Sequence, residues 1–264
     1  MVKKILEIST WILSALGLVA LLGFARVTHY KQAVTGLDLE IQANKEGGFL
    51  HYNEMHLNIT ELVGANRTKP LSNIHIRSLQ KQLETNPFVA QAEASTTLER
   101  RLRVKLIERE PFVRFFTNDN TSYYIDKDKT IFPTENDHIS RVIIANGQLE
   151  PLPIPPETAF KLDQLINKKH PVFSIAKVAS AITSDPFMQV LIDQIYVNDK
   201  YEIELTPKVG NATILVGDTN DINQKIFNIS AFFQSRANDP RLLEYSSINA
   251  KFRNQIVCTK RDTL

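Results

Sequence analysis

Titratable and metal-binding side chains form two local clusters, and neither has the spacing that its chemistry requires. His51 and His56 enclose a glutamate in a zinc-like pattern, but a zinc helix needs two histidines one turn apart on one face. A separation of five residues turns them about 140° apart. Asp126 and Asp128 resemble the first ligands of a calcium loop, but the glycine and glutamate of that loop do not follow. We therefore expect no metal site, with surface side chains at 51–56 and a turn at 126–129.

The remaining composition argues against catalysis and nucleic-acid binding. The chain has no Gly-x-Ser-x-Gly motif, no glycine-rich phosphate loop and no Cys/His motif, and Cys258 is its single cysteine. The formal net charge is only +2, from 31 basic and 29 acidic residues, whereas a nucleic-acid binder usually has a basic stripe. The longest basic cluster, residues 100–105, alternates as on a strand, which predicts a solvent-facing surface. We predict a protein without enzymatic activity, cofactor or nucleic-acid partner.

Residues 8–25 carry no charge and follow Lys3 and Lys4. Eighteen such residues are about the minimum for a helix that crosses a bilayer. No Ala-x-Ala cleavage site precedes the next charges, so we favour a membrane anchor over a cleaved leader or a buried helix. The predicted layout is a cytoplasmic stub at 1–7, a transmembrane helix at 8–25 and a linker at 26–36, with the N-terminus inside.

Residues 37–113 show the order strand, helix, helix, strand, strand. Alternating residues predict a strand at 37–41 and a hairpin at 90–106, and apolar stripes predict helices at 53–63 and 73–83, the second capped by Ser72 or Asn73. These elements would form a three-stranded sheet with two helices on one face. The fold class is therefore α+β.

Residues 114–258 alternate between strand and helix patterns. We predict helices from Pro156 to about Ile166, from Ser174 to Asp185, and from Thr219 to Phe233, with antiparallel strands at 201–205 and 212–216. The final strand would run from 247 to 257. Its even positions (Ile248, Ala250, Phe252 and Ile256) are apolar and its odd positions are polar.

An ordered set of motifs resembles the FtsQ/DivIB cell-division proteins, in particular their Bacteroidota branch. It comprises Asn86-Pro87-Phe88-Val89 with Ala92, then Glu108-Arg109-Glu110-Pro111, Tyr124-Ile125-Asp126 and Phe132-Pro133. The segments IDQIYVNDKYEIELTPKVGNATILVG and INAKFRNQIVCTK continue the resemblance, which covers essentially the whole chain. The turn at 126–129 departs from the family because it lacks glycine, so Asp128 or Lys129 must take a positive φ.

This resemblance implies a non-enzymatic scaffold of the division machinery. It implies a single-pass inner-membrane protein at the septum, with a POTRA domain at 37–113, a mixed β domain at 114–258 and a tail at 259–264, the body being periplasmic. It also implies FtsB and FtsL as partners in assembling septal cell-wall synthesis.

The last predicted strand is the expected partner-binding edge, because an unpaired strand edge accepts a partner strand. The resemblance places Phe252 at the aromatic and Lys251 at the basic position of the partner-binding strand. The alternative is that Phe252 belongs to the core. The candidate partner-binding residues are Ser247, Asn249, Lys251, Phe252, Arg253, Gln255 and Val257.

Two other functions are compatible with this organisation. A POTRA-type protein of an export or outer-membrane assembly system usually precedes a long membrane barrel, for which 264 residues leave no room. An anchored envelope enzyme, such as a peptidoglycan hydrolase, would need an acid–base or nucleophile set that no local motif supplies.

Overall fold

The computed structural model describes residues 2–31, 33–43, 48–64, 70, 73–135, 138–155, 157–236, 239–253 and 255–261. The chain divides into two compact units. Unit 1 comprises Met1–Ala43, Leu50–Thr85 and Val89–Glu108, and unit 2 comprises Asn44–Phe49, Asn86–Phe88 and Arg109–Leu264. Both contain helices and sheet, which confirms the predicted α+β class.

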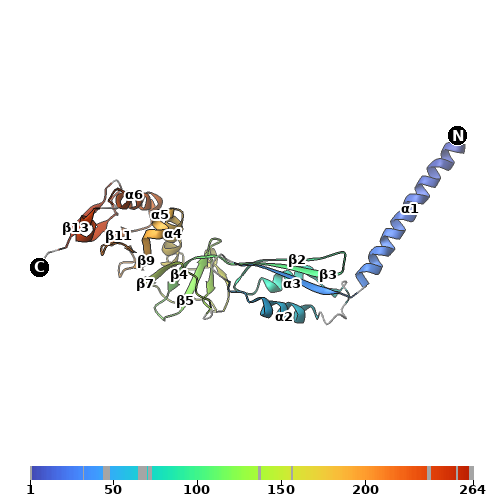
Figure 1. Ribbon diagram of the computed structural model, residues 1–264, viewed down its shortest axis with the longest axis horizontal. Helices are drawn as coiled ribbons and strands as arrows, with labels where there is room; N and C mark the ends of the chain where they lie inside the picture. The colour runs from blue at the N-terminus through green and yellow to red at the C-terminus, as the bar shows by residue number, and fades with distance from the viewer. Residues whose placement is uncertain are drawn as a thin grey trace. The chain divides into compact units, whose positions relative to one another are not determined.

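The first helix, α1 (Val2–Lys31), contains the uncharged residues 8–25 (Figure 1). Its side chains are described for residues 9–25, and the large apolar ones are exposed, including Trp11 at 77% and Leu13 at 76%. Among the described residues, no helix combines the length and apolar character of a membrane span. The membrane-spanning part of the predicted fold is thus not confirmed.

The sheet of unit 1 has the order β1-β3-β2, built from β1 (Gly36–Gln42), β2 (Val89–Thr96) and β3 (Arg101–Glu108). β3 pairs in parallel with β1 and antiparallel with β2. Figure 1 shows α2 (Tyr52–Val63) and α3 (Ile76–Leu83) on one side of this sheet. Met55, Ile59 and Leu79 of these helices are buried, as are Leu102 and Val104 of β3. Of the two predicted caps for α3, Ser72 lies outside the described residues, and His75 takes the N-cap position.

The basic cluster of β3 lies between acidic residues on both neighbouring strands. Glu40 of β1 and Glu93 of β2 both lie opposite Lys105. Asp38 accepts hydrogen bonds from the Arg101 guanidinium, which lowers the pKa of that carboxyl. Opposite charges on neighbouring strands stabilise a sheet modestly, so this cluster is a charge-paired solvent face.

Unit 2 is built on a ten-stranded mixed sheet with the order β13-β12-β11-β10-β9-β7-β4-β5-β6-β8. Three strand pairs are parallel, namely β4–β7, β7–β9 and β11–β12. The strands predicted at 201–205 and 212–216 correspond to β10 and β11, which pair antiparallel as expected. The strands are β4 (Pro111–Phe116), β5 (Ser122–Asp126), β6 (Thr130–Pro133), β7 (Ile143–Gly147), β8 (Phe160–Lys161), β9 (Ile192–Val197), β10 (Ile203–Pro207), β11 (Thr213–Gly217), β12 (Tyr245–Asn249) and β13 (Val257–Lys260).

Three helices bury their apolar faces in the main core of unit 2. They are α4 (Val172–Thr183), α5 (Pro186–Leu191) and α6 (Ile222–Ser235). Asp185-Pro186 does end α4, as the sequence predicted, but it also begins α5. The Asp185 carboxylate accepts hydrogen bonds from the backbone N–H groups of Phe187 and Met188, and Pro186 occupies the first helical turn.

The helix predicted from Pro156 to Ile166 is wrong. Pro156 itself lies outside the described residues, and the following chain forms β8 and a short 3₁₀ turn, η2 (Leu162–Gln164). Phe160 pairs with Ile131 of β6, and this sheet contact replaces helical hydrogen bonds. Ile166, which the helical stripe placed inside, is 94% exposed.

The turn between β5 and β6 confirms the expected positive φ at Lys129. Lys129 has φ 57°, which a non-glycine residue adopts rarely. The Asp126 carboxylate holds this turn by accepting a hydrogen bond of 2.8 Å from the Thr130 N–H. Asp126 is therefore a structural residue of the turn.

Candidate partner-binding surface

The C-terminal end of the sheet in unit 2 is a hairpin of β12 and β13. We call the described residues between these strands, 250–253 and 255–256, the turn. We call residues 245–260 the terminal hairpin (Figure 1). The prediction of one continuous strand over 247–257 is therefore wrong. β12 pairs with β11 on one side and β13 on the other, so β13 is the edge strand at this end of the sheet. Apolar residues occupy even positions both before and after the turn, although the turn ends the strand to which that alternation was assigned.

The start of the turn is fixed to the neighbouring strands. The Ala250 N–H donates to the Leu215 carbonyl of β11 at 2.9 Å. The Lys251 N–H donates to the Asn249 side chain at 3.0 Å, and Lys251 Nζ lies 2.6 Å from a Glu202 carboxylate oxygen. This hydrogen bond from Lys251 holds the pKa of Glu202 below its ordinary value. Lys251 thus has an internal structural role that sequence reasoning missed.

Phe252 follows Lys251 and is 47% exposed. Assignment of Phe252 to the core, the alternative hypothesis, is therefore wrong. The next residue, Arg253, is exposed, and its carbonyl accepts a hydrogen bond of 3.2 Å from the Asn228 side chain of α6. Phe227, adjacent to Asn228, is 64% exposed. A hydrogen bond between Asn228 and Arg253 therefore joins α6 to the turn, and each of these two residues is preceded by an exposed aromatic residue.

The seven predicted partner-binding residues fall into two groups. Ser247, Asn249 and Val257 lie on the strands of the terminal hairpin, and Asn249 and Val257 are directly opposite each other. Ile248 is buried in the core cluster that also contains residues of α6. Ser247, Asn249 and Val257 differ from Ile248 in parity, so they lie on the opposite face of the sheet. The other four are exposed residues of the turn: Lys251, Phe252, Arg253 and Gln255.

Cys258 lies opposite Ile248 on β13 and is half-buried. Desolvation raises the pKa of its thiol, so the thiol stays protonated and weakly nucleophilic near neutral pH. The Cys258→Ser variant is expected to bind partners as the wild type does, with less than about 1 kcal/mol of stability lost. Thermal denaturation and partner pull-down measure the two effects. An intermolecular disulfide required for division would contradict this prediction.

The family-signature residues hold the start of unit 2 together. Arg109 Nε donates to the Pro87 carbonyl at 2.8 Å, and Arg109 Nη1 donates to an Asp126 carboxylate oxygen at 2.8 Å. The Asn86 side chain accepts a hydrogen bond from the Phe88 N–H. Phe88 stacks on Phe49, with ring centroids 5.2 Å apart. These contacts are structural and form no chemical site.

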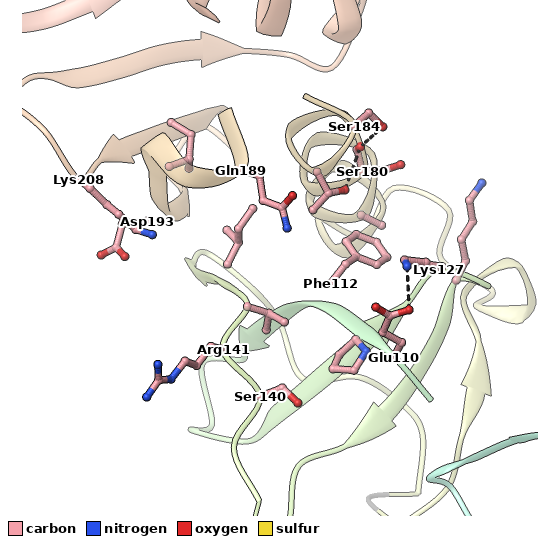
Figure 2. Close-up of a pocket in the computed structure, with 17 residues that line it drawn as sticks. Glu110, Phe112, Lys127, Ser140, Arg141, Ser180, Ser184, Gln189, Asp193 and Lys208 are labelled. Carbon is pink, nitrogen blue, oxygen red and sulfur yellow. Dashed lines mark hydrogen bonds and ion pairs between the residues drawn. The ribbon is translucent and has the colours of Figure 1, made fainter. Parts of the chain in front are cut away.

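Unit 2 also contains a groove of about 770 Å³ that is lined by α4, α5 and the start of β9, and by the starts of β4 and β7 (Figure 2). Phe112 points into it, and several of its polar side chains make contacts within the fold. Glu110 pairs with Lys127 at 2.7 Å, and the Ser184 hydroxyl donates to the Ser180 carbonyl. The lining contains neither histidine nor cysteine. Sequence patterns did not reveal this groove, because its lining residues come from segments far apart in the chain.

In the two sequence clusters that resembled metal sites, the histidine and aspartate side chains either are exposed or make other contacts. His51 precedes α2 and is exposed, while His56 stacks on Tyr52 with centroids 6.0 Å apart. Asp126 is bonded to Arg109 and Thr130 as described above. Across the described part of the chain, no three histidine, cysteine, aspartate or glutamate side chains gather around a possible ion position.

These features define an α+β protein with a mixed ten-stranded sheet that ends in a partly exposed hairpin. Comparison with family models matches residues 110–259 to the family FtsQ/DivIB, C-terminal related. This match covers more than half of the 264 residues, and the chain belongs to that family. The family is one of non-enzymatic scaffolds of cell division. No curated protein matches the chain.

Proposed function

We propose that this protein is a non-enzymatic scaffold of the division machinery that binds FtsB and FtsL through its terminal hairpin. Membership of the FtsQ/DivIB family supports a role in cell division. The observation that carries the binding surface is Phe252, a half-exposed aromatic residue on a turn that is fixed at both sides. Aromatic residues are enriched at protein interfaces, and a fixed turn presents one at low entropic cost.

Unit 1 is the proposed POTRA domain, and unit 2 corresponds to the proposed β domain. The strand and helix order of unit 1 supports the first assignment, although the contacts divide the chain at Glu108 and Arg109 rather than at residue 113. The proposed tail at 259–264 begins within β13, because Thr259 and Lys260 still pair with β12.

Depletion of the protein tests its role directly. We expect cells to form filaments while outer-membrane assembly stays intact, because septal synthesis would lack its scaffold. Loss of outer-membrane assembly would instead favour an export or assembly function, and muralytic activity of the purified protein would favour an envelope enzyme. Complementation with wild-type protein provides the control for depletion.

The proposed location is the inner membrane at the septum, with the body in the periplasm. This proposal rests on the uncharged sequence of residues 8–25 and on the exposed apolar side chains of α1. In the depletion strain, the complementing protein should sediment with membranes at full length, and a reporter active only outside the cytoplasm should be active when fused after Leu264. A shortened soluble product would contradict the anchor.

A further inference from the structure

The strand that was expected to be the open edge, β12, is covered by β13 of the same chain. Four register pairs join them, between Tyr245 and Lys260, Ser247 and Thr259, Ile248 and Cys258, and Asn249 and Val257. β13 thus occupies the position beside β12 that a partner strand would take in β-strand addition. We propose that the partner inserts an extended segment beside β12 in place of β13, rather than adding outside it. This inference rests on the proposed function.

β13 buries little of its own surface. Val257 is 42% exposed, Thr259 and Lys260 are exposed, and Cys258 is half-buried. The Lys260–Glu244 ion pair lies at the surface, and such pairs stabilise weakly. Other side-chain contacts join the Ser246 hydroxyl to the Thr259 carbonyl at 3.2 Å and to the Lys260 carbonyl at 3.5 Å, and Arg261 to the Asn211 carbonyl at 2.8 Å. Cys258 is the β13 side chain that packs against the core cluster among the described residues. Segments with few buried apolar contacts open most readily.

β12 differs from β13 because it is part of the core. Ile248 is 1% exposed and pairs with Ile214 of β11, and the turn after β12 is fixed by Lys251 and Arg253 as described above. Removal of β13 would therefore leave β12 and the turn in place, with one row of backbone groups and one side of Ile248 uncovered. An incoming strand would restore both.

The outer edge of β13 is a poor acceptor for a partner. It is only four residues long and ends in Lys260, and short, lysine-bearing edge strands resist pairing with another chain. The site beside β12 instead fits an extended segment that places one small apolar residue opposite Ile248, where Cys258 now lies. Polar or β-branched residues would fit on either side of that residue, opposite Ser247 and Asn249.

A reversible disulfide between β12 and β13 tests the exchange. In the full-length chain, Ser247→Cys and Thr259→Cys place two thiols directly opposite, and Cys258→Ser removes the native thiol. Opposite residues of antiparallel strands have Cα separations of about 4.5 or 5.5 Å, which a disulfide can bridge. We expect the oxidised form to bind the periplasmic FtsB–FtsL complex at least tenfold more weakly than the reduced form of the same variant.

Three outcomes separate this inference from the proposed function. Weak binding only in the oxidised form supports strand exchange. Equal binding in both forms overturns exchange and leaves the proposed function intact, because the partner then docks on the closed hairpin. Absence of binding in the wild type and in both forms overturns the proposed function and the exchange together.

A chain that ends at Ile256 provides a second measurement, because it lacks β13 altogether. Its association rate with FtsB–FtsL should exceed that of the wild type several-fold, since β13 is then never paired with β12 and the binding site is always open. An unchanged or slower association rate in a truncated chain of normal melting temperature would overturn the exchange.

Discussion

Replacement of Arg109 by alanine is expected to lower the free energy of unfolding by about 3–5 kcal/mol. The Arg109 and Asp126 side chains are only 10% and 5% exposed, so removal of the guanidinium leaves a buried carboxylate without its ion pair. The Pro87 carbonyl loses a hydrogen bond at the same time. Denaturant unfolding of the purified full-length chain, followed by circular dichroism, measures the loss.

The adjacent ion pair supplies the control for Arg109→Ala. Lys127 and Glu110 are 70% and 51% exposed, so Lys127→Ala should cost less than about 1 kcal/mol. The larger loss of stability in Arg109→Ala would then be due to the burial of its ion pair, since both variants remove an ion pair. Equal losses in the two variants would show that the Arg109–Asp126 pair has no special role in unit 2.

Replacement of Phe252 by alanine is expected to weaken FtsB–FtsL binding by about 2 kcal/mol, or roughly thirtyfold. A half-exposed ring can become buried when a partner docks, and truncation then loses that contact. The melting temperature should change little, because the ring contributes only part of its surface to the fold. Tyr52→Ala is the matched control, since Tyr52 is 52% exposed but lies in unit 1.

Lys251 needs a different design because it has a structural partner. The single variant Lys251→Glu would place two carboxylates together at Glu202 and disturb the turn. The double variant Lys251→Glu, Glu202→Lys restores the ion pair while exchanging the two charges. Recovery of binding in the double variant would assign Lys251 to fixing the turn, whereas binding that stays weak at normal stability would assign it to partner contact.

Hydrophobic periodicity correctly predicted the elements in which a single face is buried from end to end. The stripe of α4 and the alternation of β3 appear in the structure where the sequence placed them, because one face of each is buried along its whole length. The apolar stripe after Pro156 wrongly predicted a helix. Leu162 and Leu165 are buried because a short turn docks on the core, and Phe160 pairs with β6. Tertiary contacts replaced the local helical preference there.

The candidate surface could be predicted in part. The sequence identified the segment and the polar, half-buried parity of Ser247 and Asn249, but it did not reveal the turn. The connection at 250–256 contains no glycine or proline, and Ile256 happens to match the parity of Ile248. The pairing of Cys258 with Ile248 depends on a hairpin that periodicity cannot distinguish from a continuous strand.

The most direct test of the central claim is the dissociation constant of the periplasmic FtsB–FtsL complex, measured by calorimetry on the full-length chain. The proposed scaffold predicts binding by the wild type and by Tyr52→Ala, and at least tenfold weaker binding by Phe252→Ala at an unchanged melting temperature. Wild-type affinity in Phe252→Ala, or no binding by the wild type, would contradict the terminal hairpin as the partner-binding surface.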